Sequence, residues 1–124
     1  IERITDDEME QFDDIFRYME FYTKKNDIHM MMYANLAFHK HIYKTSHDRM
    51  LDKTLTTYFN YCKYSCPPNY FAPKFLDKTL EERRRIYSAY LKKDVTSGAR
   101  AMKLHMSSTI KRAIANINLN IYEK

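Results

Sequence analysis

The chain has 124 residues, of which 44% are hydrophobic and 30% charged, with a single glycine and three prolines. This length and composition favour one globular, mainly helical domain and exclude a disordered chain. No apolar run reaches the roughly 18 residues of a membrane-spanning helix, and no signal-peptide pattern is present. We therefore expect no membrane contact.

The first two predicted helices occupy about residues 5–22 and 28–45. Thr5 and Glu8 have the spacing of a capping box, in which each residue's side chain accepts a hydrogen bond from the other's backbone N–H. Residues of the first helix then recur at helical spacing, as on a buried face: Met9, Phe12, Phe16, Met19. After a turn at residues 24–27, the second helix carries a comparable stripe: Ile28, Met31, Asn35, Phe38, Ile42.

Three further helices are predicted, with a loop at residues 66–75 because three prolines fall there. The expected N-caps of these helices are Ser46, Asp77 and Asp94. The third helix has the apolar set Leu51, Leu55, Tyr58 or Phe59, Cys62, and the fifth has the stripe Ala99, Met102, Met106, Ile110, Ala113, Ile117. Five helices without strands predict an all-α antiparallel bundle with a central ligand pocket.

Four polar residues fall on inner or near-inner faces of three of these helices: Asn35, His39, Arg83, His105. Asn35 and His39 are four positions apart, so their side chains share one helix face. Polar groups among apolar ones cost free energy unless something satisfies them, and the four residues therefore predict a pocket. The alternative is that the histidines are satisfied core residues and that Arg83 lies on the surface beside Arg84.

Two longer patterns surround these residues. Residues 33–51, YANLAFHKHIYKTSHDRML, contain Asn35 followed after two residues by Phe38-His39. Residues 81–106, EERRRIYSAYLKKDVTSGARAMKLHM, carry a second pattern: Glu82-Arg83, Ile86, Ala89, Asp94, Ala99, Met102, His105. Together they resemble the FCD domain, the C-terminal effector-binding domain of GntR-type bacterial transcription regulators of the FadR subfamily. The resemblance covers roughly residues 5–115.

The resemblance implies a regulatory domain and no enzymatic activity. Residues 1–124 would be the effector-binding and dimerisation domain of a longer regulator. Its N-terminal winged-helix DNA-binding domain and first helix or helices would be absent from this sequence. The resemblance further implies a homodimer that contacts DNA only through that missing domain. The effector would be a small carboxylate held by Asn35, His39, Arg83 and His105.

In the FCD family, the positions of His39 and His105 bind a divalent metal together with an acid and a third histidine. Here the acid position holds Asn35 and the third histidine position holds Arg83. A guanidinium stays protonated and cannot be a metal ligand. We therefore expect that His39, His105 and Asn35 bind zinc or nickel only weakly. Arg83 itself can supply the positive charge and hold a carboxylate in a fork.

Two other classes of function stay open at this point. One is a helical-bundle enzyme that uses His39 and His105 as acid and base, although no nucleophile motif supports it. The other is a basic nucleic-acid-binding module, suggested by a net charge of +11 over residues 21–124. These basic residues are scattered over several helices, which favours a solvated face. Cys62 and Cys66 are interpreted as two small apolar residues, and so few cysteines fit a protein of the reducing cytoplasm.

Overall fold

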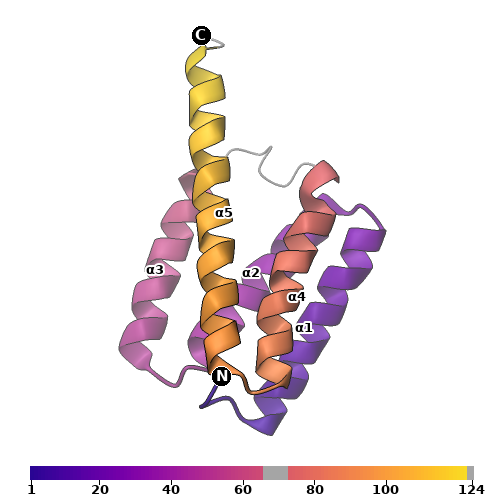
Figure 1. The fold of residues 1–124 in the computed structure, drawn as a ribbon, viewed down its shortest axis with the longest axis vertical. Coiled ribbons are helices and arrows are strands. Elements are labelled where there is room, and N and C mark those ends of the chain that lie inside the picture. The colour runs from indigo at the N-terminus through magenta and orange to yellow at the C-terminus, as the bar shows by residue number, and fades with distance from the viewer. Residues whose placement is uncertain (66–72, 123–124) are drawn as a thin grey trace.

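The computed structural model describes residues 1–65 and 73–122, with side chains at residues 1–61 and 74–115. These ranges contain the helices α1 (Asp6–Lys24), α2 (Ile28–Lys44), α3 (Arg49–Ser65), α4 (Leu76–Leu91) and α5 (Val95–Tyr122), and the short 3₁₀ turn η2 (Pro73–Phe75). No strand occurs among them, and the all-α bundle is confirmed (Figure 1). None of the helices so described is long and apolar enough to cross a membrane.

α1 packs against both α2 and α4, while α2 also contacts α3, and α4 also contacts α5. Figure 1 shows α5 lying in front of α2, between α3 and α4, and extending past the ends of the other helices. This arrangement surrounds α2 with the other helices. Residues on its inner face therefore meet side chains from α4 and α5, which lie far along the chain.

The helix N-termini follow local hydrogen-bonding rules, with two corrections to the sequence prediction. The capping box of Thr5 and Glu8 is confirmed, and Asp94 caps α5 by accepting from the Ser97 N–H at 3.0 Å. Asp48, and not Ser46, caps α3, because the Ser46 hydroxyl is used to bond the Tyr43 carbonyl at the end of α2. Asp77 lies inside the first turn of α4, because η2 leads directly into that helix and moves its start to Leu76.

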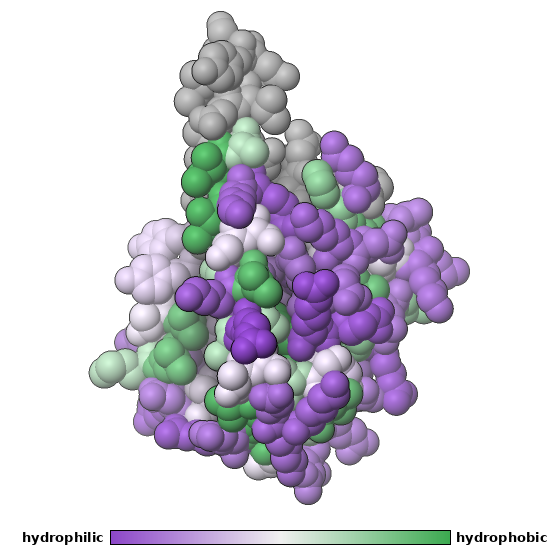
Figure 2. Space-filling view, in the orientation of Figure 1, coloured by the Kyte–Doolittle hydropathy of each residue, from purple (hydrophilic) through white to green (hydrophobic). Residues whose placement is uncertain are grey.

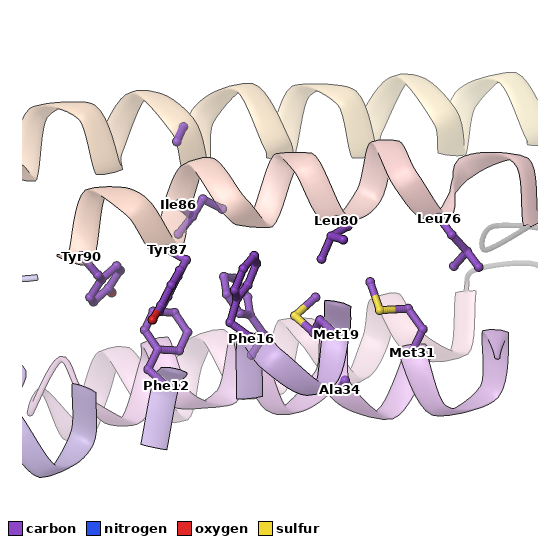
Figure 3. Close-up of a cluster of buried hydrophobic side chains, with 12 residues drawn as sticks. Phe12, Phe16, Met19, Met31, Ala34, Leu76, Leu80, Ile86, Tyr87 and Tyr90 are labelled. Carbon is purple, nitrogen blue, oxygen red and sulfur yellow. The ribbon is translucent and has the colours of Figure 1, made fainter. Parts of the chain in front are cut away.

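The apolar core lies between α4 on one side and α1 and α2 on the other (Figure 3). The predicted stripes of α1 and α2 are confirmed, since their central residues are buried there. Phe12 packs its ring against Phe38, Tyr87 and Tyr90, with ring centroids 4.9 to 5.5 Å apart. α5 contributes only Ala101 to this core, and α3 contributes no fully buried residue among those described.

The predicted apolar stripe of α5 is wrong over most of its length. Ala99, Met106 and Ile110 are exposed, Met102 and Ala113 are half-buried, and Ile117 lies outside the described side chains. The helix instead buries a face that contains Ala101 and His105. In this orientation, polar side chains of α5 contact charged groups on α4. Without these contacts, the charged groups on α4 would be buried without those partners.

The third helix also departs from its predicted pattern. Leu51 and Tyr58 are exposed, Leu55 and Phe59 are half-buried, and Cys62 lies outside the described side chains. Apolar residues are therefore visible on the surface along α3 and α5 (Figure 2).

Candidate functional site

Three helices bring the four predicted polar residues together. Asn35 and His39 lie one turn apart on α2, Arg83 lies on α4, and His105 lies near the middle of α5. All four are buried, with between 2% and 7% of each residue exposed. Contacts link them in space although up to 70 residues separate them along the chain.

Arg83 points into the bundle, so its interpretation as a surface residue is wrong. Its Nε donates to the Asn35 amide oxygen at 2.8 Å. Its Nη1 lies 3.4 Å from the Thr79 carbonyl oxygen and 3.3 Å from a carboxylate oxygen of Glu82. A buried guanidinium needs such acceptors, because an isolated charge in a low-dielectric interior is strongly disfavoured.

Glu82 and Arg112 belong to the same cluster, and sequence reasoning did not select either as a site residue. The Glu82 Oε2 lies 3.0 Å from the His105 Nδ1 and 3.2 Å from the Arg112 Nη2, and its Oε1 lies 3.3 Å from the Arg112 Nη1. Two parallel contacts of this kind form the bidentate carboxylate–guanidinium pair. Arg112 follows His105 by seven residues, two helical turns on the same face, which is the signal that could have revealed it.

The two imidazoles are neutral near pH 7. Burial lowers the pKa of His39 well below its usual range, and the nearby charge of Arg83 lowers it further. For His105, burial and then Arg83 lower the pKa to about 4, although the contact with Glu82 acts in the opposite direction. Burial acts to raise the pKa of Glu82, but hydrogen bonds from Arg112 and His105 outweigh it and leave that pKa below its ordinary value.

The position of Glu82 fixes the tautomer of His105. A carboxylate can only accept, so the His105 Nδ1 must carry the proton that is donated across 3.0 Å. The Arg83 Nη1, 3.3 Å from the same nitrogen, is also a donor. The remaining lone pair of His105 is therefore on Nε2. The His39 ring stacks on the His105 ring, with centroids 5.3 Å apart.

The donor atoms present here do not fit a tight zinc or nickel site. The Asn35 oxygen already accepts from Arg83, and the guanidinium adds a fixed positive charge beside both imidazoles. Among the residues that the structure describes, no group of three or more His, Cys, Asp or Glu is placed to hold a metal ion. Protein zinc sites ordinarily use three or four such ligands.

The side chains of the cluster contact one another directly. A separate groove of about 330 Å³ lies between α4 and α5 and is lined by residues that include Arg84, Arg85 and Arg100. None of the four clustered residues lines that groove. Entry of a ligand among the four residues therefore requires at least one of the resident contacts to be exchanged.

Comparison with known protein families gives one match. Residues 1–108 match the model of the FCD domain, which therefore covers α1 to α4 and the first half of α5, including all four predicted residues. No curated protein and no solved structure matches the chain significantly.

Proposed function

The chain belongs to the FCD domain family, and we propose that it is the effector-binding domain of a GntR-type regulator of the FadR subfamily, sensing a small organic acid. The single observation that carries this proposal is the buried Arg83 guanidinium, held between Asn35 and Glu82 and next to two neutral imidazoles. A fixed cation with planar donors is well suited to a carboxylate. FCD domains are regulatory, so we expect no turnover.

Arg83 would take over the role that a bound metal has in related domains. The three charged side chains of the cluster are Arg83, Arg112 and Glu82, which together carry one net positive charge. That charge favours entry of an anion into a site that water reaches poorly, where the attraction is stronger than at the surface. His39 and His105 would then contact the neutral part of the acid.

Signal transfer would follow from the origin of these residues on α2, α4 and α5. A ligand that contacts all three helices favours whichever packing of the helices it binds best. In a homodimer of residues 1–124, this change would move the DNA-binding domains of the full regulator. We expect such a protein in the cytoplasm, where its operator is accessible.

Calorimetric titration of the chain with acetate, lactate, malonate and citrate tests the proposal. We expect at least one acid to bind and to raise the melting temperature, and Arg83→Gln to weaken that binding by about 100-fold, because a charge-assisted fork is lost. Arg85→Gln is the matched control, since Arg85 is an exposed neighbour on the same helix that pairs with Glu81. An unchanged affinity in the folded Arg83 variant, or binding of no acid at all, contradicts the proposal.

The substitution of a cation for a metal has its own test. The double change Asn35→Asp and Arg83→His supplies the carboxylate and the third imidazole, and it removes the repelling charge. We expect zinc affinity to rise by at least about 100-fold over the unmodified chain, measured by competition with a chelator. Asn35→Asp alone should give a much smaller increase, because Arg83 would pair with the new carboxylate. Tight zinc binding by the unmodified chain would show that the cation does not replace the metal.

A further inference from the structure

The carboxylate of Glu82 already occupies the position that an acidic ligand of this site would take. It lies within 3.3 Å of donor atoms of Arg83, His105 and Arg112, which come from α4 and α5. Its side chain is 11% exposed, compared with 3% for the side chains of both Arg83 and His105. The Arg112 side chain is 16% exposed. Glu82 and Arg112 therefore lie at the edge of the cluster, while Arg83 and His105 lie deeper.

We propose that Glu82 is a resident carboxylate that holds this site closed, and that the effector is a compact dianion that displaces it from Arg83 and Arg112. This inference rests on the proposed function and extends it in two ways. It makes Glu82 and Arg112 the residues that determine ligand specificity, and it defines the class of ligand by charge.

The bonding of Arg83 indicates which of its contacts an anion would exchange. Its Nε is used by Asn35, and its Nη1 faces Thr79 and Glu82. Displacing Asn35 or the Thr79 carbonyl would leave a buried polar group without its partner, which is costly. Displacing Glu82 costs less, because a glutamate at the edge of the cluster can rotate into water and be solvated there.

Charge balance then selects the ligand. With Glu82 in place, the cluster carries one net positive charge. When Glu82 turns outward, Arg83 and Arg112 leave two positive charges among neutral imidazoles. A dianion balances both charges, whereas a monoanion leaves one of them uncompensated in a poorly solvated site. A small dicarboxylate and inorganic phosphate share this chemistry.

The exchange also couples the ligand to helix packing. Glu82 on α4 and Arg112 on α5 form a bidentate pair that joins the two helices. Its replacement by a ligand changes what holds the second half of α5 against the bundle. Figure 1 shows that this half includes the C-terminal end of α5, which extends past the ends of the other helices.

Calorimetry with malonate, inorganic phosphate and acetate on the unmodified chain and on Glu82→Gln tests the exchange. We expect malonate to bind Glu82→Gln at least about tenfold more tightly, because the competing carboxylate is gone. Glu81→Gln is the matched control: it removes the same charge from the preceding residue, which is 51% exposed, and should change affinity less than about twofold. A stronger gain for malonate than for phosphate identifies a dicarboxylate ligand, and the reverse identifies phosphate.

Substitution of Arg112 provides a second, independent test of the exchange. Arg112→Gln should lower malonate affinity by about tenfold and abolish the preference for malonate over acetate, which a purely structural role would not do. If Glu82→Gln does not fold, Glu82→Asp keeps the charge and shortens the side chain by one methylene. We then expect malonate to bind Glu82→Asp severalfold more tightly than it binds the unmodified chain.

The outcomes separate this inference from the proposed function. If acids bind the unmodified chain through Arg83 but the Glu82 variants bind no more tightly than Glu81→Gln, the exchange is wrong and the sensing function stands. Stronger binding of acetate than of malonate likewise overturns the dianion assignment alone. If no anion binds either the unmodified chain or a folded Glu82 variant, both are wrong.

Discussion

Phe12 and Arg83 are almost equally buried, at 0% and 2% exposed, yet they are stabilised in different ways. Phe12 lies in the core between α1, α2 and α4, where rings and aliphatic chains fill the space and no single partner is essential. Arg83 lies in the polar cluster between α2, α4 and α5, where each group satisfies another. The core depends on volume, and the cluster depends on hydrogen-bonding partners and charge.

This difference explains why the two regions should respond to different perturbations. An apolar core tolerates changes that preserve its volume and does not sense pH directly. A buried polar cluster tolerates few substitutions, because the loss of one member leaves another without its partner. Truncation of the core, acidification and removal of one member of the cluster test that contrast.

Truncation of the core should cost most. We expect Phe12→Ala to reduce the free energy of unfolding by about 3–5 kcal/mol, because it removes a ring that contacts Phe38, Tyr87 and Tyr90. Phe12→Leu should cost clearly less, since most of the volume remains. Urea denaturation measures both values. Equal losses in the two variants would mean that the ring contacts, and not the filled volume, stabilise the core.

The sequence predicts the core better than the polar cluster, for a physical reason. Residues such as Phe16 and Met19 have only one favourable environment, so their helical spacing alone locates a buried face. The same logic failed on α5, where Met106 and Ile110 are exposed and His105 is buried. Burial there is decided by the need of charged groups on α4 for partners, and such long-range needs leave no periodic apolar signal in α5.

The cluster itself was predictable only in part. Family resemblance located Asn35, His39, Arg83 and His105, and the structure brings them together. The family resemblance did not indicate that the Arg83 guanidinium would contact Glu82 as well. That contact depends on two consecutive residues of α4 both directing their side chains toward α5, which sequence spacing on an ideal helix argues against.

Acidification should destabilise the cluster and leave the core unaffected. Because the pKa of His105 is lowered from 6.5 to about 4, the unfolded chain binds a proton at higher pH than the folded chain does. The stabilisation is therefore fully present above pH 6.5 and is lost as the pH falls toward 4. The loss from His105 is on the order of 3 kcal/mol, and the lowered pKa of His39 adds to it in the same direction.

Urea denaturation at several pH values between 7 and 4 measures this slope. His105→Asn should flatten it, because an amide can still donate to Glu82 but does not titrate. His29→Asn is the matched control, since His29 is exposed on α2. A slope that is the same in the His105 variant and in the unmodified chain would show that other groups cause the acid sensitivity.

Removal of a neutral partner from the cluster should have the smallest of these effects, although it leaves a charge incompletely satisfied. Asn35→Ala deletes the oxygen that accepts from the Arg83 Nε at 2.8 Å, and we expect it to cost about 1–3 kcal/mol. Asn60→Ala, at an exposed position of α3, corrects for the higher helix propensity of alanine and should cost about 0.5 kcal/mol or less. Adding Arg83→Met to Asn35→Ala should recover part of the loss, because an apolar pair needs no acceptor. Two losses that simply add in this double variant would mean that Asn35 and Arg83 are buried side by side without stabilising each other.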